Sequence, residues 1–156
     1  MAMAKDKQPG GTPVIRNRKA YHDYSIGEEV EAGIVLNGCE VKMVRQGSFS
    51  LQEAYCEIRA GEVWLVNSHI PEYAQASTHV SVEPLRRRKL LLKRQEIKRL
   101  RRKVVEKGNT IIPLKAYFVR GKVKVLIGLA TGKRQRDKRE TIKQRDLHRE
   151  DSRIRS

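Results

Sequence analysis

Short runs of alternating apolar and polar residues recur along this chain, and such alternation is typical of β-strands with one buried face. The clearest run covers residues 29–36, where four apolar side chains would face one way and two glutamates and a glycine the other. The two faces comprise Val30, Ala32, Ile34 and Leu36, and Glu29, Glu31 and Gly33. A glycine inside a strand indicates a bulge or a close approach of another segment, which we expect at Gly33. An earlier strand is predicted to begin at Tyr21.

Two glycine turns, at Ala60-Gly61 and Arg120-Gly121, predict two β-hairpins. Their strands would cover residues 49–59 and 62–70, and residues 110–119 and 122–130. In the last strand Val123, Val125, Ile127 and Leu129 alternate inward, so Lys122 and Lys124 project from the opposite face. Pro113 cannot donate to a strand ladder, which places it at an edge or a bulge.

Helical patterns occur in two places. Residues 39–46 fit two helical turns ended by Gly47, and residues 92–107 place Ile97, Leu100 and Val104 on one face before Gly108. The second segment has no usual N-cap residue before it. About six short strands with two or three short helices predict a mainly β protein, an OB-like six-stranded β-barrel with a flexible basic C-terminal tail.

The ends of the chain lack the pattern of a packed core. Residues 1–13 show no periodicity, so residues 1–16 are expected to be a disordered lead and residues 17–131 the barrel. Residues 132–156 contain only three apolar side chains and should be disordered alone. On a helical wheel, however, five basic residues of this tail fall within an arc of about 100°, so the tail could fold as a helix against phosphate. These residues are Arg134, Lys138, Arg145, Arg149 and Arg153.

Charge changes the picture from an ordinary barrel to a nucleic-acid-binding one. The 156 residues carry a formal net charge of +16 with 38% apolar residues, and such an excess is stabilised by a polyanion. The charge is unevenly placed: residues 20–84 have three basic and ten acidic groups, whereas residues 85–107 have twelve basic and two acidic. An acidic middle excludes a uniform coat for nucleic acid and indicates separate basic faces.

The compartment is predicted from what the sequence lacks. Cys39 and Cys56 are too few for a disulfide framework, which favours a reducing compartment. No apolar run resembles a signal peptide or a membrane span. We therefore expect a cytoplasmic protein that contacts no membrane.

Basic residues gather in two adjoining blocks, Arg86 to Lys89 and Lys93 to Lys103. Such a run is often a solvated face, but here almost no acidic partners stand at i,i+4, which favours contact with RNA or DNA phosphates.

Catalysis finds little support. The histidines and cysteines lack zinc-ligand spacing and no nucleotide-binding loop is present, so neither a metal, a cofactor nor an enzymatic activity is expected. Asp23, Glu29 and Glu31 could imitate a carboxylate cluster, although strand carboxylates are more often exposed faces.

Some exposed residues allow two interpretations. Glu31 repels phosphate, so its useful role would be to accept hydrogen bonds from base edges or 2′-hydroxyls, and the alternative is an inert surface glutamate. Tyr24, Tyr55 and Trp64 could stack on bases or pack in the core.

Several ordered motifs resemble the SsrA-binding protein family, also called SmpB. They begin with Asn17-Arg18-Lys19-Ala20-Tyr21-His22-Asp23-Tyr24, Glu31-Ala32-Gly33-Ile34, Gly38-Cys39-Glu40-Val41-Lys42 and Ser77-Thr78-His79. They continue with Arg88-Lys89-Leu90-Leu91-Leu92, Glu96-Ile97, Gly132-Lys133-Arg134 and Asp137-Lys138-Arg139.

The resemblance implies an OB-like, non-enzymatic protein that binds transfer-messenger RNA (tmRNA, or SsrA RNA) through its tRNA-like domain. Such proteins deliver tmRNA to stalled ribosomes for trans-translation, together with elongation factor Tu. The resemblance further implies a monomer that stands in for the anticodon arm at the decoding centre of the small subunit, with its tail in the empty mRNA channel. A ribosomal protein or assembly factor is the alternative, and an RNA-processing enzyme a third.

The resemblance also implies roles for matching residues. Those that would contact tmRNA are Asn17, Arg18, Lys19, His22, Glu31, Leu91 and Lys124. Gly132 would be the hinge before the ribosome-binding tail, whose matching residues are Lys133, Arg134, Arg136, Asp137, Lys138, Arg139, Lys143, Arg145, Arg149 and Ile154. Arg136 stands where some relatives carry histidine, so a stacking role there would fall to a guanidinium. Met43 occupies a small-residue position of several relatives.

Overall fold

The computed structural model describes residues 11–73 and 82–132, with ten helices and strands in that part of the chain. The first five are β1 (Ile15–Arg16), α1 (Arg18–Asp23), β2 (Tyr24–Ile34), α2 (Gly38–Arg45) and β3 (Tyr55–Arg59). The others are β4 (Glu62–Val66), β5 (Arg88–Leu91), α3 (Arg94–Lys107), β6 (Thr110–Val119) and β7 (Lys122–Gly132). The predictions for residues 1–10 and 133–156 lie outside the described residues.

The strands form a closed ring, which confirms the mainly β, six-stranded barrel. Their order is β6-β3-β4-β5-β2-β7, the pairing of β6 with β7 completes the circle, and the two-residue β1 adds a seventh strand against β6. The ring is uneven, because β2, β6 and β7 pair over long stretches whereas β3 meets β6 through the single pair Cys56–Ile111. The barrel therefore has a seam between β3 and β6.

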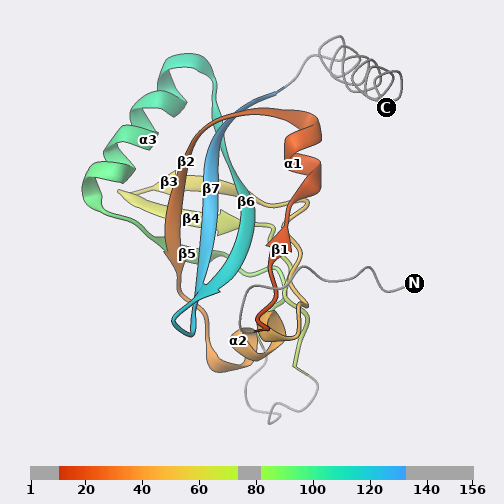
Figure 1. Cartoon of the computed structure of the whole chain (residues 1–156). Coiled ribbons are helices and arrows are strands. Elements are labelled where there is room, and N and C mark those ends of the chain that lie inside the picture. Colours follow the sequence, from red (N-terminus) through yellow and green to blue (C-terminus); the bar gives the residue numbers. More distant parts are fainter. Residues whose placement is uncertain (1–10, 74–81, 133–156) are drawn as a thin grey trace, which may run out of the picture.

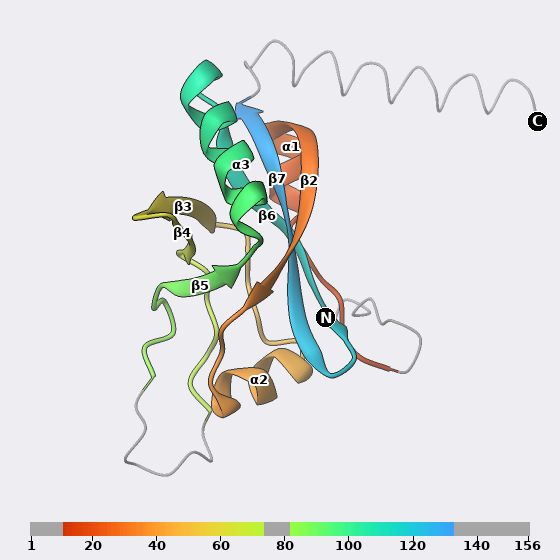
Figure 2. The same ribbon diagram turned by 90° about the vertical axis from the view of Figure 1, so that its left-hand side faces the viewer.

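Figures 1 and 2 show the three helices at different places around this ring. The main core fills the barrel and includes inward side chains of β7, and α2 and α3 contribute Val44 and Leu100, each 1% exposed. In both views α2 lies at one end of the barrel, while α1, α3 and the end of β7 lie toward the other.

A second, smaller core lies on the outer side of β2, β7 and β6. Ala20 of α1 packs there on Ile112, Leu114 and Ala130, with Tyr24 at the edge. Close packing explains Gly128, because a Cβ at this position would lie 2.9 Å from Leu114 Cδ1. The short helix α1 thus covers one half of this outer face and leaves the other half exposed.

Several predicted boundaries are wrong. The strand expected from Tyr21 is the helix α1, because the Asn17 side chain caps it by accepting a hydrogen bond from the Ala20 N–H at 3.2 Å. Residues 49–54 precede β3 and residues 67–70 follow β4 rather than belonging to these strands, although Ser50 forms an isolated bridge with His69. The lead expected to reach residue 16 already enters the sheet at Ile15, which is 8% exposed.

Candidate RNA interface

The exposed half of the outer face carries a row of side chains that crosses four strands. Leu91 of β5 pairs with Gly33 of β2, Gly33 pairs with Lys124 of β7, and Lys124 pairs with Tyr117 of β6. Gly33 is the close approach expected from the sequence: a Cβ there would lie 3.3 Å from Leu91 Cβ and 3.7 Å from Lys124 Nζ. The missing side chain therefore lets Leu91 and Lys124 approach each other over the strand.

A second row lies beside the first and contains Glu31. Glu31 pairs with Leu126, and Leu126 pairs with Lys115. The Tyr117 hydroxyl of the first row donates a hydrogen bond to the Glu31 carboxylate, and Lys115 Nζ lies 5.5 Å from the centroid of the Tyr117 ring. Burial, and then the hydrogen bond and negative charge of Glu31, raise the pKa of Tyr117 to about 12. Glu31 is thus an exposed hydrogen-bond acceptor whose carboxylate is oriented by the Tyr117 hydroxyl.

These two rows bring together three of the seven residues predicted to bind tmRNA: Glu31, Leu91 and Lys124. Leu91 is 52% exposed, which is a large apolar area for a surface position. An acceptor, an apolar side chain and a cation within two neighbouring rows can contact a base edge or ribose hydroxyl, an apolar base surface and a phosphate together. Tyr117 and Lys115 belong to the same surface, and sequence reasoning missed them because only strand register joins them to Lys124 and Glu31.

The other four predicted residues lie in or beside α1. Arg18, Lys19 and His22 are exposed, with Lys19 Nζ 2.7 Å from Glu53 Oε1 and His22 Nδ1 2.8 Å from Asp23 Oδ1. Burial and then the charge of Glu29, two residues from Glu31, raise the pKa of Tyr21 against a smaller opposing effect of Arg16. The helix therefore borders the surface that contains Glu31.

Asn17 is not available for the direct contact predicted for it. It is 1% exposed, and its Nδ2 donates to the backbone oxygens of Leu51 and Pro113 at 3.0 and 2.8 Å while its Oδ1 caps α1. The side chain joins three separate segments. These contacts hold α1 on the barrel.

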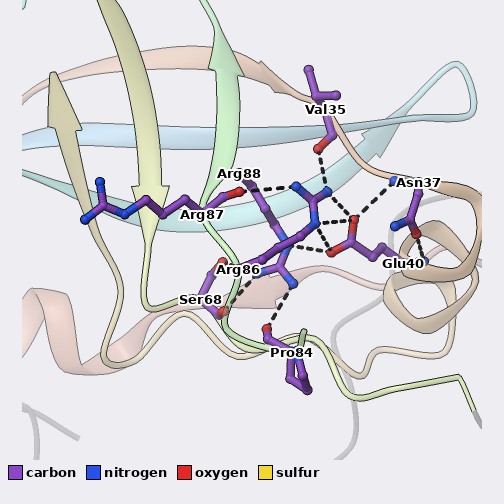
Figure 3. A network of polar contacts seen from close by, with 8 residues as sticks. All are labelled: Val35, Asn37, Glu40, Ser68, Pro84, Arg86, Arg87 and Arg88. Atoms are coloured by element: carbon purple, nitrogen blue, oxygen red, sulfur yellow. Dashed lines mark hydrogen bonds and ion pairs between the residues drawn. The ribbon is translucent and has the colours of Figure 1, made fainter. Parts of the chain in front are cut away.

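The basic block Arg86 to Lys89 is mostly a structural element, which corrects its interpretation as a phosphate-binding stripe. Arg86 and Arg88 both bind the buried carboxylate of Glu40 in α2 (Figure 3). Arg88 is 0% exposed and donates to Glu40 Oε2 at 2.7 Å, to the Ser68 backbone oxygen at 2.9 Å, to Ser68 Oγ at 2.8 Å and to the Pro84 oxygen at 2.9 Å. Lys89 pairs with Glu62, and Arg87 lies near Glu57.

The Glu40 site is a buried ion-pair network. Burial acts to raise the pKa of Glu40, but hydrogen bonds from Arg86 and Arg88 outweigh burial and hold the pKa below its ordinary value. Glu40 also accepts from the Asn37 N–H at 3.1 Å and thereby caps α2 (Figure 3). The network ties α2 to β5 and to the loops at Ser68 and Pro84.

The remaining candidates divide between the core and the surface. Tyr24 packs at the edge of the outer core, Trp64 is half-buried, and Tyr55 is 39% exposed. Gly132 is exposed at the end of β7 and pairs with Tyr24, so the chain leaves the barrel beside α1. The tail residues predicted to bind the ribosome, from Lys133 to Ile154, lie outside the described residues.

Two further observations concern only residues 11–73 and 82–132. They contain no cluster of three or more His, Cys, Asp or Glu residues that could hold a metal ion. None of their helices is long and apolar enough to cross a membrane.

A sequence profile of the SmpB protein family matches residues 14–156. The chain belongs to the SmpB family. The family expected from the motifs is thus confirmed. The chain is 48% identical to the SsrA-binding protein of Levilactobacillus brevis over 154 residues, which is 99% of this chain and 98% of that protein. It is 53% identical to the SsrA-binding protein of Cupriavidus necator over 138 residues, or 88% of this chain and 92% of that one.

A solved structure shares the fold. Its description reads "tmRNA-SmpB: a journey to the center of the bacterial ribosome", and the match has a TM-score of 0.66 at 46% identity. It covers 83% of this chain and 94% of the other. The barrel described above is therefore the barrel of this family.

Proposed function

We propose that this chain binds tmRNA and brings it to stalled ribosomes in trans-translation. The observation that carries the proposal is the convergence of Glu31, Leu91 and Lys124 on one exposed face, in a chain whose family is known for SsrA binding. A uniformly basic protein would bind any RNA through phosphates. Here an ordered carboxylate beside a lysine favours one RNA shape over others, because the carboxylate rejects a phosphate and accepts a base edge or 2′-hydroxyl.

The tRNA-like domain of tmRNA is the part that this face would hold. In this arrangement the barrel replaces the anticodon arm, and elongation factor Tu carries the loaded complex to the ribosome. One copy of the chain suffices for one RNA domain. No step of this function requires the protein to break or form a covalent bond.

The basic tail after Gly132 would serve a second contact, inside the empty mRNA channel past the decoding centre. Support comes from the separation of charge along the sequence, since residues 133–156 are basic and follow a hydrogen-bonded end of the barrel. Gly132, after which the tail begins, pairs with Tyr24 directly after α1, two residues beyond His22.

Two experiments test the proposal. Sequencing of RNA that copurifies with the full chain should find tmRNA, and the protein should leave ribosomes in a high-salt wash. Retention on washed ribosomes, with no enrichment of tmRNA, would instead indicate a ribosomal protein.

Truncation after Gly132 and Glu31→Ala separate the two contacts. Truncation should leave the affinity for the tRNA-like domain nearly intact and abolish tagging of stalled chains. Glu31→Ala should weaken binding to the tRNA-like domain more than binding to a random duplex. An equal loss of affinity for the tRNA-like domain and for the random duplex would indicate that Glu31 makes no specific contact with tmRNA.

A further inference from the structure

The helix α3 carries many basic side chains, and their surroundings differ. Ile97, Leu100 and Val104 face the core, and Arg99 and Lys103 bind Glu28 of β2 at 2.9 and 3.0 Å. On the remaining side lie four exposed cations and one valine, at spacings that place them within an arc of about 100° at 3.6 residues per turn. The exposed carboxylate of Glu106 lies at the C-terminal edge of this arc. This α3 stripe consists of Arg94, Lys98, Arg101, Arg102 and Val105.

The cations of the α3 stripe have no ion-pair or hydrogen-bond partner among the side chains that the structure describes. Four unpaired like charges along three helical turns repel one another, and a polyanion offsets that repulsion. Val105 stands among them and is 78% exposed, the largest exposure among the large hydrophobic residues of the described chain. A solvated basic face does not require an apolar residue at its centre.

Beside the α3 stripe lies a groove of about 420 Å³, at the seam where β3 and β6 meet through one pair only. Its walls are mainly apolar and come from three elements: Ile58 of the β3–β4 hairpin, Ile111 of β6, and Val104 and Val105 of α3. Arg101 stands at its edge. The one carboxylate in the wall, Glu57, is neutralised by Arg59 at 3.4 Å and Arg87 at 3.3 Å.

We propose that the α3 stripe and this groove bind an unpaired nucleotide of ribosomal RNA. The base lies in the groove against Val105 with the Arg101 guanidinium on its plane, and Lys98 and Arg102 hold the flanking phosphates. An apolar groove beside cations fits a base that is splayed out of a loop or bulge, because a duplex hides the faces of its bases.

The position of the stripe indicates a second RNA. Arg101 and Val105 of the α3 stripe line the groove beside the β3–β4 hairpin, whereas the opposite flank of α3 meets β2 through Glu28. The strand β2 presents Glu31 on its exposed face, whereas Glu28 of the same strand is bound to Arg99 and Lys103 of α3, so the α3 stripe and the Glu31 face are separate surfaces. The inference rests on the proposed function, which supplies ribosomal RNA as the second RNA.

The test compares two double variants of equal charge in the full chain: Lys98→Gln/Arg102→Gln on the stripe, and Arg120→Gln/Lys122→Gln at the β6–β7 turn. Affinity is measured for purified ribosomes and, separately, for the tRNA-like domain of tmRNA. At about 0.2 M salt each lost single-strand phosphate contact weakens binding about threefold, so the stripe variant should lose roughly tenfold for ribosomes. Its slope of log K against log salt should also fall by about 1.4. The turn variant should stay within twofold.

Val105→Ser tests the base contact without changing charge. Ribosome affinity should fall about fivefold with an unchanged salt slope, and chemical probing should show one unpaired ribosomal nucleotide that the wild-type chain protects and this variant does not. Equal losses in the stripe and turn variants, or a stripe variant that loses tmRNA affinity as strongly as ribosome affinity, would overturn the inference. Failure of the proposed function would appear differently, as wild-type protein without preference for tmRNA.

Discussion

Arg88→Met separates a structural arginine from an RNA-binding one, in a block of four basic residues that look alike in sequence. Arg88 is fully buried and donates to Glu40, Ser68 and Pro84 (Figure 3). Methionine fills similar space and donates nothing. We expect the variant to fold with much lower stability, because the acceptors around the missing guanidinium stay buried.

The magnitude follows from the number and burial of these bonds. Breaking one partner of a buried ion pair costs about 3–5 kcal/mol, although Arg86 continues to neutralise Glu40. For a chain of this size the melting temperature should fall by roughly 10–20 °C. Calorimetry or urea denaturation measures both quantities, and the slope of the urea transition should not change.

Arg87→Met is the matched control. Arg87 is adjacent in sequence, but its side chain is 47% exposed and its contact with Glu57 is 3.3 Å long. Exposed pairs contribute about 0–1 kcal/mol, so its melting temperature should stay within a few degrees of wild type. Equal melting temperatures for Arg88→Met and wild type, with a loss of RNA affinity in Arg88→Met alone, would refute the structural role.

Three further predictions concern pH and the RNA face. The pKa of Glu40 is lowered in the folded chain, so ionised Glu40 stabilises the fold fully above its ordinary pKa of 4.5. This contribution to the free energy of unfolding should be lost as the pH falls through the lower folded pKa. Glu40→Gln should lack this part of the loss of stability when unfolding is measured at decreasing pH. Gly33→Val should displace Leu91 and Lys124 and weaken tmRNA binding at least tenfold, whereas Gly38→Ala, where a Cβ meets nothing within 4 Å, should leave it unchanged in a binding titration. Tyr117→Phe should weaken tmRNA binding about fivefold, because it removes the hydrogen bond that orients Glu31. In a double-mutant cycle Tyr117→Phe should cause no further loss of affinity when Glu31 is already alanine. Additive losses of affinity would show that the two side chains are not coupled.

Periodicity alone predicted most of the barrel, because β7 and the second half of β2 alternate cleanly between core and surface. It failed at Tyr21, where one capping side chain from Asn17 decides for a helix. Capping depends on where the preceding strand ends, and a two-residue strand such as β1 leaves almost no pattern in a sequence.

The candidate site was predicted in part. Glu31 and Lys124 were expected to face outward from alternation, and the family resemblance added Leu91. Gly33 was expected on the same face as a close approach, but Tyr117 and Lys115 joined the site only through strand register, which long-range pairing sets. For Arg88 the sequence-based prediction was wrong. Its position in a run of basic residues indicates surface charge, but in the fold it binds Glu40, which is 48 residues away in the sequence.

A comparison of two lysines of β7 tests most directly whether the face with Glu31, Leu91 and Lys124 binds tmRNA specifically. Lys124 lies in the row with Leu91 and Tyr117, while Lys122 lies two residues away on the same strand beside the turn. Equilibrium binding to the tRNA-like domain of tmRNA should weaken at least tenfold for Lys124→Gln, as expected for a lost charged contact, and less than twofold for Lys122→Gln. Equal effects of the two substitutions would show that charge alone attracts the RNA and would contradict a specific site on this face.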